Sequence, residues 1–113
     1  MRLDRNTTEG GEGKYCLILN RKLQEMRRGT FQELPEHIAA ALKVLKDAGV
    51  IDDSADGDPG EFFVIRLRDQ FSKPALLAYA AAAAEAGEAE YADDMMELVK
   101  RAGASSPFCK LPD

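Results

Sequence analysis

The sequence predicts a small single domain of the α+β class, because two short apolar runs alternate with stretches of helical periodicity. The runs at residues 15–19 (YCLIL) and 62–65 (FFVI) are rich in aromatic and β-branched residues, the composition of strands. Each run is followed by about 35–40 residues of helical pattern. We therefore expect two main strands covered by four helices.

Composition sets the broad class of the protein. The 113 residues are enough for one domain, and 45% hydrophobic with 31% charged residues indicates a folded chain. The net charge of −5 disfavours nucleic-acid binding, because an acidic surface repels phosphate backbones. No apolar run reaches membrane-spanning length and the start lacks a secretory signal, so we expect a cytoplasmic protein with free thiols at Cys16 and Cys109.

In the first half, residues 1–13 are polar and glycine-rich, which predicts a flexible N-terminal arm ahead of a single domain at 14–113. The first strand is expected at 14–19, with Cys16 buried in it. Asn20 is placed to cap a short helix, and residues 35–48 carry the apolar stripe of a second helix that ends at Gly49. Val50-Ile51 is a candidate for a short third strand.

The second half repeats this order. The second strand is expected at 61–68, with Phe63, Ile65 and Leu67 facing the core and Arg66 and Arg68 on a partly covered face. Ser72 is placed to cap a third helix, Gly87 breaks it, and a fourth helix at 88–102 completes an antiparallel hairpin. The C-terminal tail, 104–113, remains part of the domain.

The two halves can be superimposed in sequence. Residues 15–18 correspond to 62–65, and the helix end at 45–49 corresponds to that at 99–103. A duplicated strand–helix–helix unit is therefore one interpretation, and chance similarity of strand and helix-end chemistry is the other.

Residue types and motifs that commonly perform catalysis are sparse in the sequence. His37 is the only histidine, and no serine lies in a nucleophile motif. No glycine-rich phosphate loop follows either strand, and the cysteines lack zinc spacing. We therefore expect no enzymatic activity, no cofactor and no metal. The acidic loop at 52–60 imitates the first half of a calcium loop, but Phe63 stands where the twelfth-position glutamate is required, so whether it binds a cation stays open.

Residues 35–68 resemble winged-helix proteins. The helix at 35–48, then Val50-Ile51, a turn and residues 62–67 give the order of a helix followed by a two-stranded wing. The resemblance implies a DNA-associated regulator. A strand takes the place of the family's first helix, however, and the tip of the wing is acidic where a DNA-reading wing is basic.

The sequence favours a small cytosolic, non-catalytic protein that acts through contact with another protein of unidentified nature. The expected contact surface comprises Arg66, Arg68, Phe108 and Leu111, with Phe108 more than half buried on its own domain or on a second copy in a homodimer. The alternatives are the winged-helix-like DNA regulator, and a small ligand-binding protein or enzyme with a pocket near Arg66 and Arg68.

Overall fold

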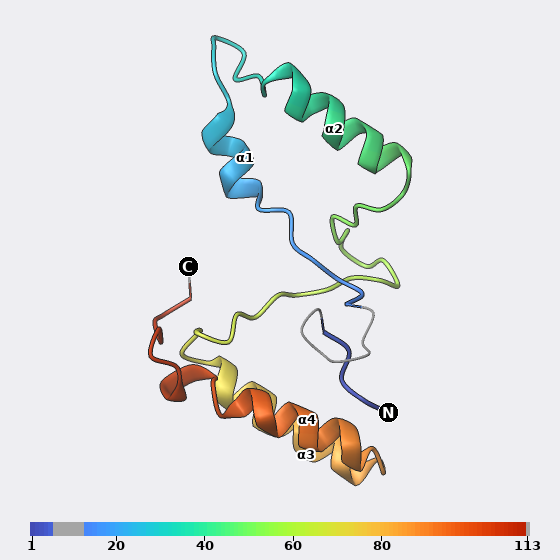
Figure 1. The fold of residues 1–113 in the computed structure, drawn as a ribbon, viewed down its shortest axis with the longest axis vertical. Helices are drawn as coiled ribbons and strands as arrows, with labels where there is room; N and C mark the ends of the chain where they lie inside the picture. The colour runs from blue at the N-terminus through green and yellow to red at the C-terminus, as the bar shows by residue number, and fades with distance from the viewer. Residues whose placement is uncertain (6–12, 113) are drawn as a thin grey trace. The chain divides into compact units, whose positions relative to one another are not determined.

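The computed structural model describes residues 1–5 and 13–112, and throughout these residues it contains helices and no β-strand (Figure 1). The helices are α1 (Asn20–Met26), α2 (Glu36–Asp47), α3 (Ser72–Glu85), α4 (Ala89–Val99) and the short 3-10 helix η1 (Gly103–Ser105). The chain divides into two compact units. We call Met1–Tyr15 with Phe63–Asp113 the hairpin unit and Cys16–Phe62 the central unit, and each is described by itself.

The α+β prediction is wrong, because neither apolar run has a neighbouring strand to pair with. Residues 14–19, 50–51 and 61–68 form no ladder in the described part of the chain, where the only β-type pairs are isolated bridges. The composition of an apolar run is typical of strands, but it does not show whether another strand lies beside it. A strand without a neighbour leaves its backbone N–H and C=O groups unpaired. Phe63, expected in the core, is 87% exposed.

The helical predictions are confirmed, with ends that differ by a few residues. All four α-helices lie where the apolar periodicity placed them. At the end of α2 the N–H of Gly49 donates to the carbonyl of Lys46 at 3.0 Å, and that of Val50 to Leu45 at 3.2 Å. This pair of bonds is the left-handed capping pattern expected from the sequence.

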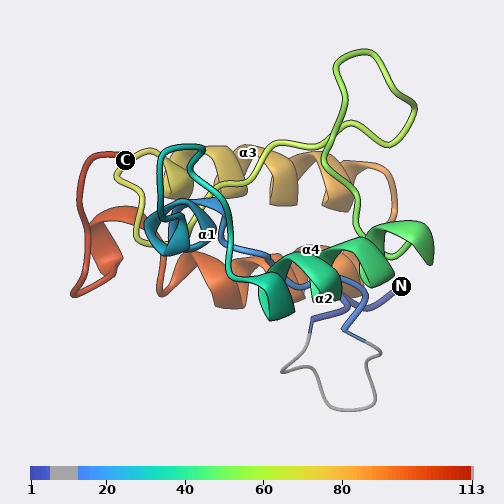
Figure 2. The same cartoon turned by 90° about the horizontal axis from the view of Figure 1, so that it is seen from above.

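The antiparallel hairpin of α3 and α4 is also confirmed, and Figure 2 shows the two helices side by side. The chain reverses at Gly87, whose φ of +88° lies in the region that favours glycine. The N–H of Gly87 donates to Ala84 at 3.0 Å and that of Glu88 to Ala83 at 2.9 Å, which satisfies the last carbonyls of α3.

The core of the hairpin unit lies between α3 and α4. Ala80, Met95 and Leu98 are buried there. Partly buried apolar side chains close around them, contributed by Leu3, Leu67, Leu76 and Tyr91. The small side chain of Ala80 allows the two helices to approach closely, so the alanine-rich sequence of α3 serves packing.

The N-terminal residues lie against α4. The guanidinium of Arg2 donates two hydrogen bonds of 2.7 Å to the carboxylate of Asp94, and the N–H of Leu3 donates a third at 2.9 Å. The terminal amine lies 3.3 Å from Glu88. Of the arm expected at 1–13, residues 6–12 lie outside the described part of the chain.

The central unit contains α1 and α2 but buries none of its residues. Cys16, expected inside a strand, is exposed. The helices α1 and α2 do not pack against one another as α3 and α4 do. With both strands absent as well, the structure gives no support to a duplicated unit.

Candidate functional site

The candidate site lies where α3 begins and α4 ends, and a buried serine organises it. Ser72 has no exposed surface. Its hydroxyl donates to the carbonyl of Leu67 at 2.7 Å and accepts from the N–H of Gly103 at 3.0 Å. The same N–H also donates to the Leu67 carbonyl at 2.7 Å. Ser72 was expected to cap α3, but it makes no capping bond and instead joins the two ends of the hairpin.

Gly103 fits this junction because it has no side chain. A Cβ at this position would lie 2.9 Å from the Cβ of Lys73 and 3.3 Å from the carbonyl oxygen of Gln70. Its φ of +52° is in addition a conformation that other residues rarely adopt. The close approach of η1 to the first turn of α3 therefore depends on glycine.

The C-terminal tail continues along the same junction. The N–H of Gln70 donates to the carbonyl of Lys110 at 2.8 Å, and the N–H of Lys110 donates to the carbonyl of Arg68 at 3.0 Å. These bonds form a parallel bridge between Asp69 and Lys110. The tail is thus fixed by its backbone, while Phe108 is 74% exposed. The expectation that Phe108 is buried on its own domain is wrong.

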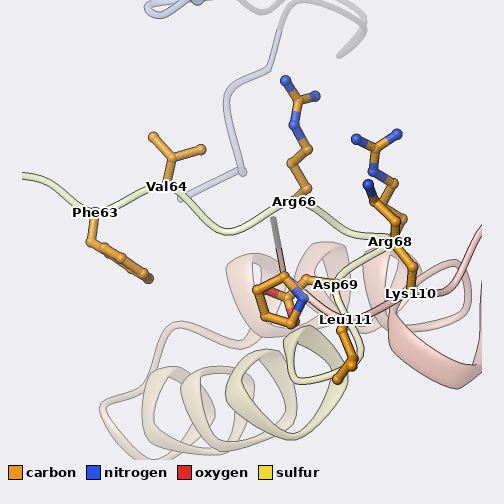
Figure 3. Close-up of a pocket in the computed structure, with 8 residues that line it drawn as sticks. Phe63, Val64, Arg66, Arg68, Asp69, Lys110 and Leu111 are labelled. Atoms are coloured by element: carbon orange, nitrogen blue, oxygen red, sulfur yellow. The ribbon is translucent and has the colours of Figure 1, made fainter. Parts of the chain in front are cut away.

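Two open hollows lie on this junction and share the side chains of Arg66 and Arg68. The first, of about 260 Å³, is shown in Figure 3, where Arg66 and Arg68 extend to the same side of the chain. It is lined by Phe63, Val64, Arg66, Arg68, Asp69, Lys110, Leu111 and Pro112. The second, of about 680 Å³, is lined by Arg66, Leu67, Arg68, Arg101, Ser105, Ser106, Pro107 and Phe108.

The charged groups of the two hollows are mostly cationic. Among the described residues, the side chains of Arg66 and Arg101 make no ion pair or hydrogen bond. The carboxylate of Asp69 accepts the N–H of Phe71 at 2.7 Å. The ammonium of Lys73 donates to the hydroxyl of Ser105 at 2.8 Å. Two arginines therefore remain available to an anion, in a chain that is acidic as a whole.

The structure brings all four predicted surface residues to this junction. Arg66, Arg68 and Leu111 line the first hollow, and the two arginines line the second together with Phe108. The sequence did not reveal Arg101 and Lys110, because their position depends on the bonds of Gly103 and of the tail. We call the six residues the arginine face: Arg66, Arg68, Arg101, Phe108, Lys110 and Leu111.

The two hollows combine cationic, hydroxyl and apolar groups. Hydroxyl groups are present at Ser105 and Ser106, and Ser106 accepts the N–H of Phe108 at 3.1 Å. The only histidine, His37, belongs to α2 in the other unit. Within the described ranges, no three histidine, cysteine or carboxylate side chains gather as a metal site requires. Guanidinium groups beside apolar side chains suit an anionic group attached to an apolar one.

The acidic loop at 52–60 is organised by its own hydrogen bonds. The carboxylate of Asp52 accepts the N–H of Ser54 at 2.9 Å. The Ser54 hydroxyl accepts the N–H of Phe62 at 2.8 Å and donates to the Phe62 carbonyl at 3.0 Å. The turn residues of this loop thus close it on itself, as side chains of this type commonly do.

No family model, curated protein or solved structure matches the chain. None of the helices in residues 1–5 and 13–112 has the length and apolar character needed to cross a membrane.

Proposed function

We propose that this is a cytosolic, non-catalytic protein that works by contact with another protein, and that the arginine face is the contact surface. One observation carries the proposal. Two arginines without a partner among the described residues stand beside exposed apolar side chains, on a backbone that is fixed by the hydrogen bonds of Ser72 and Gly103.

This combination has the character of a protein interface. Arginine and aromatic side chains are enriched among the residues that dominate binding energy. Phe108 and Leu111 are 74% and 64% exposed, so both have apolar surface that a partner can bury. Because the tail is held by backbone bonds to Arg68 and Gln70, little chain entropy remains to be lost on association.

The two alternatives receive less support. A winged-helix regulator rested on a two-stranded wing at 50–51 and 62–67, and the described residues form no strand there. A small ligand-binding protein or enzyme rested on a deep pocket near Arg66 and Arg68. The hollows are open, and no general base lies among their lining residues apart from Asp69, which already accepts a backbone N–H.

The test compares variants of the full chain as bait in an extract of its source organism. We expect the wild type to capture a defined protein and the double variant Arg66→Gln/Arg101→Gln to lose it. Lys100→Gln is the matched control, since Lys100 precedes Arg101 directly and is absent from the linings of both hollows. Equal capture by the double variant and the wild type would overturn the proposal, provided circular dichroism shows that all three proteins are folded.

A further inference from the structure

We propose that the second hollow of the arginine face binds a phosphate monoester carried on a side chain of the partner, an inference that rests on the proposed function. The hollow brings together three guanidinium groups, two hydroxyl groups and an exposed aromatic ring. Each of these features matches a different part of such a ligand.

Charge favours a phosphoryl group over a carboxylate. A phosphate monoester carries about −1.5 to −2 charges at neutral pH, whereas a carboxylate carries one. Arg66, Arg68 and Arg101 line one hollow, and of these Arg66 and Arg101 have no partner among the described residues. The planar fork of a guanidinium pairs with two phosphate oxygens at once, and clusters of arginines are a recurrent means of recognising phosphorylated segments.

The remaining lining suits the group that carries the phosphate. Ser105 and Ser106 offer hydroxyl groups close to the arginines, and Pro107 and Phe108 form an apolar wall. The volume of about 680 Å³ lies within the range of about 300–1,000 Å³ typical of ligand sites. A single phosphorylated side chain fits this space, and the open side of the hollow leaves room for the segment to which it belongs.

A short ligand suits this surface better than a long polyanion. The positive charge is local, because the chain as a whole carries −5. Carboxylates are present along α4 at Glu90, Asp93 and Glu97. With a screening length of about 8 Å at physiological salt, a phosphorylated side chain responds mainly to the arginines beside it, whereas a nucleic-acid strand also meets the acidic surface.

The test is a titration of the isotope-labelled full chain with phenyl phosphate, followed by two-dimensional NMR. We expect saturable shifts at Arg101, Ser105 and Phe108, and weaker binding of benzoate. Arg66→Gln and Arg101→Gln should each weaken binding about tenfold or more, since a hydrogen bond to a charged group contributes about 1.5–3 kcal/mol. Lys100→Gln should change it less than about threefold, because an exposed charge outside the hollow contributes little. Binding should also tighten from pH 5 to 7.5, because the second pKa of a phosphate monoester lies near 6.

Three results would overturn the inference: no saturable shift at these residues, equal affinity for benzoate, or tighter binding of a single-stranded oligonucleotide through the same arginines. The two proposals fail separately. If phenyl phosphate does not bind but the double variant still loses the partner, the phosphate site is wrong and the contact function stands. If phenyl phosphate binds through the arginines and capture is unaffected by their loss, the contact function is wrong and the inferred partner with it.

Discussion

The backbone nitrogen of Gly103 lies 3.0 Å from the hydroxyl oxygen of Ser72, to which its N–H donates, although the two residues are 31 positions apart in sequence. The contact joins the beginning of α3 to the segment that follows α4. Arg66 and Arg68 precede this contact on one segment, and Arg101 precedes it on the other. A neutral, buried hydrogen-bond network therefore brings the arginines of the arginine face together.

Replacing Ser72 by alanine should lower the free energy of unfolding by about 1–3 kcal/mol, because a buried hydrogen bond is lost and the Leu67 carbonyl loses one of its two donors. Urea denaturation measures the change. Ser105→Ala is the matched control, since its hydroxyl is exposed and bonded only to Lys73, and it should cost less than about 0.5 kcal/mol. Equal effects of the two substitutions would show that the junction is not the stabilising contact described.

The effect of a side chain at Gly103 can be separated from the cost of its backbone angle. Gly103→Ala and Gly87→Ala both place alanine at positive φ, but only at Gly103 does the new Cβ meet other atoms, at 2.9 Å from Lys73. Gly87→Ala should therefore cost about 1–2 kcal/mol, the penalty of the left-handed conformation alone. Gly103→Ala should lower the free energy of unfolding clearly more than Gly87→Ala does. Thermal denaturation of both variants measures the difference. If the two variants melt alike, the close approach of η1 to α3 is wrong.

The observed core predicts that truncating Leu98 destabilises the protein strongly and that truncating Phe63 does not. Leu98 is 9% exposed and packs with Met95, so Leu98→Ala should lower the free energy of unfolding by about 2–5 kcal/mol. Phe63 is 87% exposed, so Phe63→Ala should change it by less than about 0.5 kcal/mol. A large effect at Phe63, of the size expected for a strand in the core, would restore the sequence-based interpretation.

The local part of this fold could be predicted from the sequence, and the long-range part could not. Helix α2 and the turn at Gly87 follow from apolar periodicity and from glycine at a helix end, which are properties of neighbouring residues. The apolar runs at 15–19 and 62–65 indicated strands, because composition carries no information on whether a second strand lies close enough to pair. Of the two expected strands, at 14–19 and 61–68, only the second contributes to the core, through Leu67.

The candidate site likewise contains residues that the sequence could place and residues that it could not. Arg66 and Arg68 could be placed on one face because alternate residues of an extended segment share a side. Phe108 could be included because its tail is more apolar than a free tail usually is. Arg101 and Lys110 join them only through backbone bonds made by Gly103 and by the tail itself. Nothing in the sequence pattern of Ser72 or Gly103 distinguishes them from an ordinary helix cap and helix stop.

The pairing of Arg2 with Asp94 predicts a pH dependence of stability. The hydrogen bonds from the Arg2 guanidinium, and next the N–H of Leu3, lower the pKa of Asp94 below its ordinary value of 3.8. A carboxyl with a lowered pKa in the folded state binds its proton more readily when the chain is unfolded. Its contribution to stability is therefore complete above about pH 5 and is lost as the pH falls through 3.8 toward the lowered value.

Asp94→Asn removes the negative charge while keeping the shape of the side chain, so it isolates this effect. The free energies of unfolding of the wild type and of Asp94→Asn should differ at pH 7, with the wild type more stable, and should converge as the pH approaches 3. Arg2→Gln should have an effect in the same direction, because it removes the guanidinium whose hydrogen bonds lower the pKa of Asp94 most. Asp93→Asn is the matched control: Asp93 is the exposed neighbour of Asp94 on α4, and its variant should show no such convergence with the wild type. A difference between wild type and Asp94→Asn that stays constant from pH 7 to pH 3 would show that the N-terminal residues do not hold this carboxylate in solution.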